Sequence, residues 1–112
     1  MKKYKILMAL MGLEIGGAET HVVELSKELK KQGVWIYGTA AEGTTPLYGA
    51  DLRGPAAIVI GSEGSGMGRL VRETCDFLVS IPMKGRISSL NASAAAAILL
   101  YEAVRQRQER AN

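Results

Sequence analysis

The chain has very little cysteine and histidine. Cys75 is its only cysteine and His21 its only histidine among 112 residues. A single cysteine excludes an intramolecular disulfide, and one cysteine with one histidine excludes the usual ligand sets of structural zinc sites. A lone histidine on the flank of a helix is more often solvent-exposed or structural than catalytic. The sequence therefore predicts no metal site, and it predicts that Cys75 is a small buried side chain.

Aromatic residues are also scarce, at 5% of the chain, so the core has to be aliphatic. A length of 112 residues suits a single domain with one core. Hydrophobic residues make up 47% and charged residues 22%, which is typical of a globular protein rather than a disordered one. The net charge of +3 is compatible with RNA binding, but a small excess of charge does not by itself indicate it.

Long apolar runs are absent. The apolar residues 4–11, which follow Lys2 and Lys3, are too few to span a bilayer, and no small-residue cleavage site follows them. A first buried strand explains this run better than a signal peptide does. We expect a cytoplasmic protein without a membrane partner.

Short apolar runs without alternation predict buried strands, as in a parallel sheet that is covered by helices on both faces. These runs are Lys5–Met11, Val34–Gly38, Ala56–Ile60 and Phe77–Ile81. The predicted fold is a single three-layer α/β domain with a mostly parallel sheet of about four strands.

Helical spacing of apolar residues predicts the elements between these strands. A first helix should turn Ile15, Ala18, Val22, Leu25 and Leu29 toward the sheet and end at Gly33 in a left-handed cap. The other expected elements are a turn near Pro46–Ala50, a short helix around Met67–Thr74 and a last helix from about Ala92 to Gln108.

Three loops follow the carboxyl ends of predicted strands, namely Thr39–Glu42, Gly61–Gly66 and Met83–Asn91. In open α/β sheets the ligand crevice lies beyond these strand ends. Glycines in the second loop allow the backbone to approach a ligand closely. By itself this glycine-rich loop lacks the spacing of the dinucleotide fingerprint, and a plain strand-to-helix turn is the alternative interpretation.

Two of these loops carry specific motifs, Ile58-Val59-Ile60-Gly61-Ser62-Glu63-Gly64-Ser65-Gly66-Met67 and Ile81-Pro82-Met83-Lys84-Gly85-Arg86-Ile87-Ser88-Ser89-Leu90-Asn91-Ala92-Ser93. Together they resemble the two C-terminal motifs of SpoU-type (SPOUT, TrmH-like) RNA ribose 2′-O-methyltransferases, over about residues 34–108. This resemblance implies S-adenosylmethionine as the cofactor, held by loops that form a trefoil knot. An unknotted flavodoxin-like or Rossmann-like arrangement is the alternative.

The resemblance also implies roles for individual residues. The cofactor would be bound by Thr39, Ala40, Gly61, Gly64, Ile81, Met83 and Leu90. The residues expected around the methyl group and the acceptor ribose are Glu63, Ser89 and Asn91. A local interpretation of these three remains open, because Ser89 and Asn91 can cap a helix and Glu63 can accept hydrogen bonds within its loop.

Residues 4–33 do not match these motifs. They contain Gly16-Gly17-Ala18-Glu19 and resemble the first strand, loop and helix of GT-B glycosyltransferases, whose donor-binding second domain has no counterpart here. SpoU-type enzymes carry an Asn and an Arg just after their first strand, but Glu14–Thr20 contains neither. We therefore expect cofactor binding with methyl transfer impaired or lost. The alternative is a recombined or engineered chimera, joined near Gly33, without ligand or activity.

Two kinds of partner are expected. RNA contacts would come from basic side chains that can equally form a solvated surface; these are Arg53, Arg69, Arg72, Lys84 and Arg86. The last helix is apolar on every side over Ala94–Tyr101, so its own sheet cannot cover all of it. We therefore expect a homodimer.

Overall fold

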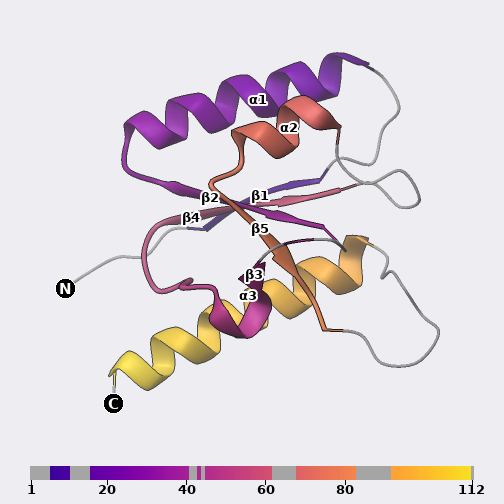
Figure 1. Ribbon diagram of the computed structural model, residues 1–112. Coiled ribbons are helices and arrows are strands. Elements are labelled where there is room, and N and C mark those ends of the chain that lie inside the picture. Colours follow the sequence, from indigo (N-terminus) through magenta and orange to yellow (C-terminus); the bar gives the residue numbers. More distant parts are fainter. Residues whose placement is uncertain are drawn as a thin grey trace.

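In the computed structural model the chain forms a five-stranded sheet whose neighbouring strands are all parallel (Figure 1). The structure describes residues 6–10, 16–40, 43, 45–61, 68–82 and 92–111, and side chains within 20–40, 43, 45–61, 68–82 and 94–108. The strands are β1 (Ile6–Leu10), β2 (Trp35–Thr39), β3 (Thr45–Pro46), β4 (Ala56–Ile60) and β5 (Phe77–Ser80). Their order is β1-β4-β2-β5-β3, so the two-residue β3 adds a short edge to the four predicted strands.

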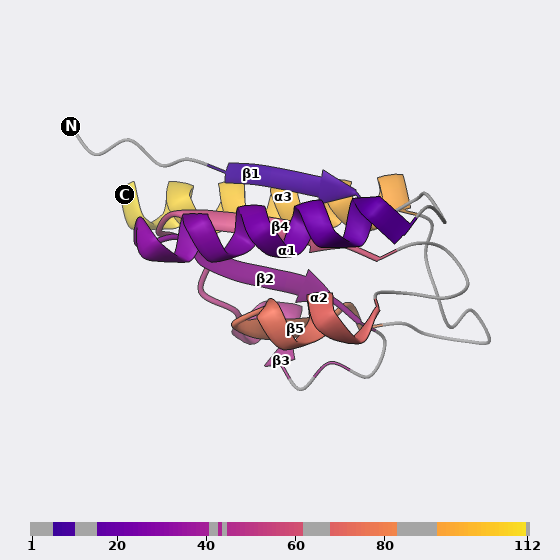
Figure 2. The same ribbon diagram turned by 90° about the horizontal axis from the view of Figure 1, so that it is seen from above.

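Helices cover both faces of this sheet, which confirms the predicted three-layer α/β fold (Figures 1 and 2). They are α1 (Gly16–Lys31), α2 (Arg69–Thr74), α3 (Ala92–Ala111) and the 3-10 turn η1 (Leu47–Gly49). Alternate residues of β4 point to opposite faces. Ala57 and Val59 pack with residues of α1 and α2, whereas Ile58 and Ile60 pack with residues of α3 and η1.

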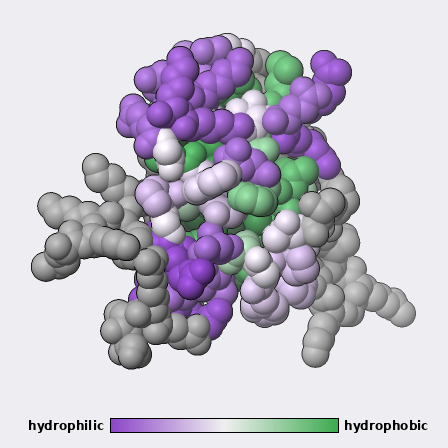
Figure 3. Space-filling model, turned by 60° about the vertical axis from the view of Figure 1, so that its left-hand side comes forward, coloured by the Kyte–Doolittle hydropathy of each residue, from purple (hydrophilic) through white to green (hydrophobic). Residues whose placement is uncertain are grey.

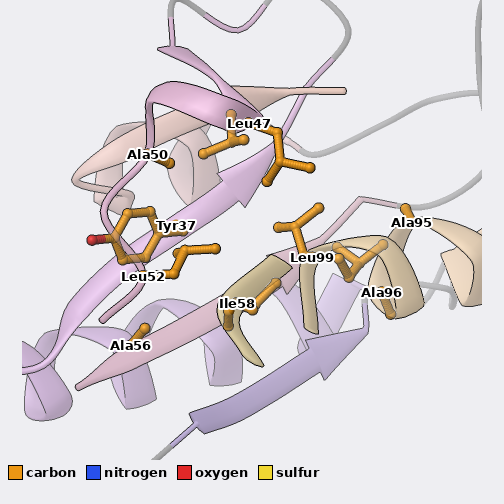
Figure 4. Packing of buried hydrophobic residues seen from close by; sticks show 12 residues of the cluster. Tyr37, Leu47, Ala50, Leu52, Ala56, Ile58, Ala95, Ala96 and Leu99 are labelled. Carbon is orange, nitrogen blue, oxygen red and sulfur yellow. The ribbon is translucent and has the colours of Figure 1, made fainter. Parts of the chain in front are cut away.

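The larger core cluster lies between the sheet and α3 (Figure 4). Leu99 of α3 is fully buried in it, together with Ile58 of β4 and Leu52, which precedes β4. Tyr37 is the aromatic member of this cluster, and its hydroxyl donates a hydrogen bond to the carbonyl of Asp51. The core is otherwise aliphatic, as the low aromatic content predicts.

Helix α1 packs on the sheet through the predicted Val22 and Leu29, but the prediction for Leu25 is wrong. Leu25 was expected to point inward, but it is 46% exposed, whereas the neighbouring Ser26 is only 5% exposed. The inward stripe runs through Val22, Ser26 and Leu29, and the small serine lets the helix lie close to the layer beneath it. The prediction for the end of the helix is confirmed, because Gly33 has φ of 85°.

A chain of polar contacts ties the second half of α3 to the loop before β4. Glu102 is only 6% exposed and accepts hydrogen bonds from Arg105 at 2.8 Å and from Gln106 at 2.9 Å. Gln106 in turn donates to the carbonyl of Ala50 and accepts from the amide of Leu52, both at 2.8 Å. These bonds fix the position of α3 against the sheet.

The Glu102 carboxylate should make folding depend on pH. Its hydrogen bonds to Arg105 lower the pKa of Glu102 in the folded chain more than burial raises it. The stabilisation is therefore complete above the pKa of the unfolded chain and is lost as the pH falls through the folded pKa. Glu102→Gln is expected to lower the free energy of unfolding by about 1 kcal/mol at neutral pH. The variant should also lose less stability than the unchanged protein as the pH falls below about 4.5. Urea unfolding of both proteins across this pH range measures the difference, and parallel curves would contradict the prediction.

Candidate cofactor site

The strand order places a topological switch point at the carboxyl ends of β4 and β2. After β1 and β4 the chain continues into α1 and α2 on one face of the sheet, whereas after β2 and β5 it continues into η1 and α3 on the other face. The neighbouring strands β4 and β2 therefore lead away from each other at their carboxyl ends. In open α/β sheets such a switch point is where ligands bind.

Four of the predicted cofactor-binding residues lie at this edge of the sheet. Thr39 ends β2 and its hydroxyl accepts a long hydrogen bond, 3.4 Å, from the amide of Gly61 after β4. The amide of Ala40 donates to the carbonyl of Val79 in β5 at 3.0 Å, and Ile81 follows the end of β5. All four residues are partly exposed, so ligand atoms can reach them. The structure thus brings residues of two predicted loops, Thr39–Glu42 and Gly61–Gly66, to one edge of the sheet, where the last residue of the fourth predicted strand, Ile81, also lies.

The other predicted site residues lie outside the described part of the chain. These are Glu63, Gly64, Met83, Ser89, Leu90 and Asn91. Their expected roles stay predictions.

Gly43 is a site residue that sequence reasoning missed. Its amide donates to the carbonyl of Ala40 at 3.0 Å, which closes a turn directly after β2. A Cβ at this position would lie 2.7 Å from the carbonyl oxygen of Leu78 and 2.9 Å from the carbonyl carbon of Val79. Because both contacts are with backbone, glycine lets the chain at this position lie close to β5. The only sequence signal was a glycine at the end of the Thr39–Glu42 loop.

The nucleophilic and metal-binding groups of the described residues offer no second reaction centre. Burial raises the pKa of Cys75 to about 11 although Lys30 and Arg72 act against it, so the thiol stays protonated and suits the structural role predicted for it. His21 is exposed on α1. Within the described ranges no group of three or more potential ligands could hold a metal ion. None of the described helices has the length and apolar character needed to cross a membrane.

The chain matches a known protein family over most of its length. The model of the SpoU rRNA Methylase family matches residues 13–101. The chain belongs to the SpoU rRNA methylase family. This finding confirms the resemblance drawn from the two glycine-containing motifs.

The curated relatives that this chain matches are longer than it is. A 23S rRNA (guanosine-2'-O-)-methyltransferase, RlmB of Ralstonia nicotianae, is 56% identical over 88 residues, which cover 79% of this chain and 35% of the relative. The chain thus spans about a third of that relative's length.

Two solved structures of the family resemble the fold. The SpoU methyltransferase AviRb from Streptomyces viridochromogenes, in complex with AdoMet, has a TM-score of 0.68 and 39% identity, and covers 79% of this chain and 34% of its own. The TrmH/SpoU tRNA modifying enzyme of A. aeolicus has a TM-score of 0.74 and 29% identity over 96% of this chain and 63% of its own.

The SpoU match extends further toward the amino terminus than the motifs predicted. It begins at residue 13 and includes α1, whereas the sequence motifs supported a start near Val34. A separate origin for residues 1–33 remains a prediction that these matches leave untested.

Proposed function

We propose that this chain is an S-adenosylmethionine-binding methyltransferase domain of the RNA ribose 2′-O type. The observation that carries the proposal is the switch point between β4 and β2, where Thr39 and Gly61 meet at the carboxyl edge of the sheet. Membership of the SpoU family and the AdoMet complex of AviRb support the choice of cofactor. The name of the RlmB relative supports RNA as the substrate class.

The proposed roles divide between two parts of the site. The adenosine is lined largely by backbone groups of Thr39, Ala40, Gly61 and Ile81. The hydrogen bond from the Gly43 amide to the Ala40 carbonyl holds Ala40 in position. When bound, S-adenosylmethionine would supply a sulfonium methyl group for transfer to a ribose 2′-oxygen. Glu63, Ser89 and Asn91 orient the ribose.

Methyl transfer by these 112 residues is proposed to be impaired. Residues 14–20 contain neither the Arg nor the Asn that SpoU-type enzymes place after their first strand. A positioned cation stabilises the alkoxide that develops on the ribose oxygen, so its loss slows the reaction more than it weakens cofactor binding. Transfer of a labelled methyl group to ribosomal RNA measures the rate, and turnover equal to that of a full-length relative would refute this part.

Calorimetric titration with S-adenosylmethionine tests the cofactor site. Binding in the micromolar range is expected, with no heat from a nucleotide sugar, which serves as the control ligand for the glycosyltransferase-like segment. Thr39→Val removes the hydroxyl that accepts from Gly61 and should weaken binding about threefold to tenfold. Thr74→Val is the matched control, because that hydroxyl bonds only within α2, to the carbonyl of Leu70.

The alternative function class predicts a different result. A folded protein that gives no heat with S-adenosylmethionine would favour a recombined scaffold that keeps the motifs without their ligand. Equal affinities of Thr39→Val and Thr74→Val would place the cofactor elsewhere.

We also propose a homodimer through the outer side of α3. Ala97 is exposed there, Tyr101 is 77% exposed and Val104 is 48% exposed, and their spacing of four and three places them on one stripe. An apolar stripe of this kind favours burial against a second copy. The trefoil knot and a cytoplasmic location remain predictions of the family resemblance.

A further inference from the structure

Three aromatic rings line up at the amino ends of β2 and β5. The rings of Tyr37 and Phe77 stack with centroids 5.2 Å apart, and Phe77 lies 5.8 Å from Trp35. Exposure rises outward along the row, from 5% for Tyr37 to 39% for Phe77 and 53% for Trp35. The strand ends that carry them come forward in Figure 3, where apolar and weakly polar residues occupy the middle of the face, below the hydrophilic side chains of α1. Two large rings are thus presented to solvent side by side.

The backbone beneath these rings is firmly held. The amide of Trp35 donates to the carbonyl of Pro55 at 3.2 Å. Next to it, Ile36 and Asp76 exchange two hydrogen bonds: the Ile36 amide donates to the Asp76 carboxylate at 2.7 Å, and the Asp76 amide donates to the Ile36 carbonyl at 2.8 Å. Rings that are already ordered lose little freedom when a ligand binds.

Three cationic side chains bind groups next to the segments that carry these rings. The Lys30 ammonium lies 3.5 Å from the carboxylate of Asp76, the residue that precedes Phe77. The Arg53 guanidinium pairs with the Asp51 carboxylate at 2.9 Å. Arg107 donates to the carbonyl of Gly54 at 2.9 Å, next to Pro55. Both acids, Asp76 and Asp51, are paired with cations. Flat apolar rings near cationic side chains fit a ligand that is itself flat and anionic.

We propose that Trp35 and Phe77 stack an unpaired nucleobase of a bound RNA strand, whose phosphates are contacted by Lys30, Arg53 and Arg107. Base stacking on aromatic rings combined with nearby cations is a general way of holding single-stranded nucleic acid. The surface lies at the amino ends of the strands, whereas the proposed cofactor site lies at their carboxyl ends, so it is a second contact region. The inference rests on the proposed function only for RNA as the ligand class.

Trp35 is the only tryptophan, so its fluorescence reports directly on this surface. Titration with a polyuridylate of about twelve nucleotides at low salt is expected to quench the emission. Phe77→Leu keeps an apolar side chain but removes the stacking partner, and should weaken binding about tenfold. Arg53→Gln should reduce the steepness with which the logarithm of the association constant falls with the logarithm of the salt concentration, by about 0.7. Tyr48→Ser is the matched control, because Tyr48 is 73% exposed on η1 and lies outside the row of rings.

Three results would overturn the inference. The first is no quenching at low salt by a protein that binds S-adenosylmethionine, which leaves the proposed function standing. The second is an equal loss of affinity in Phe77→Leu and Tyr48→Ser. The third is a tryptophan emission that changes with protein concentration in the absence of RNA, because a second copy of the chain would then cover the rings.

Discussion

Leu99→Ala is expected to lower the free energy of unfolding by about 3 kcal/mol. Leu99 has no solvent exposure and lies at the centre of the cluster between α3 and the sheet, next to Ile58 (Figure 4). Truncation removes apolar area from the core and leaves a cavity that its neighbours fill only in part. Since small domains are stable by about 5–15 kcal/mol, this loss is a large share of the total.

Urea unfolding with Leu25→Ala as the control measures this effect. Leu25 is the same residue type but is 46% exposed on α1, so its truncation should cost less than about 1 kcal/mol. Similar losses in both variants would mean that α3 does not pack on the sheet through Leu99.

Asp76→Ala is expected to lower the free energy of unfolding by about 2–3 kcal/mol. The Asp76 carboxylate accepts from the amide of Ile36 at 2.7 Å, and Ile36 has no solvent exposure. Removing the acceptor leaves a buried N–H without this partner, and it also removes the ion pair with Lys30. The start of β5 should then separate from β2.

Two further variants divide this effect into its parts. Asp76→Asn keeps an oxygen that can accept from Ile36 and should recover more than half of the loss. Lys30→Met removes only the ion pair, which is partly exposed, and should cost less than about 1 kcal/mol. If Lys30→Met proves as destabilising as Asp76→Ala, the hydrogen bond to the strand contributes little.

Local sequence was enough to predict several elements of the fold. The strand Ala56–Ile60 has the bounds that its apolar run predicts, because Pro55 and Gly61 bracket five residues that pack on both faces of the sheet. Gly33 ends α1 because a positive φ suits glycine above other residues. The motifs around Gly61 and Met83 were enough to identify the SpoU family.

Prediction from sequence failed where a contact depends on distant residues. Helical spacing allowed Leu25 to face inward, but the orientation of α1 over the sheet buries Ser26 instead. Nothing near Asp76 in the sequence indicates its partner Ile36, and nothing near Gln106 indicates that it binds the carbonyl of Ala50 before β4.

The sequence by itself determined the fold class and the family, because hydrophobic runs, glycines and motifs are local properties. Only the tertiary structure decided the strand order β1-β4-β2-β5-β3, and with it the switch point at which Thr39 and Gly61 meet. It also decided that Trp35 and Phe77, far apart in the chain, form one exposed aromatic surface. Strand order follows from how all the helices share the two faces of the sheet, and no single segment carries that information.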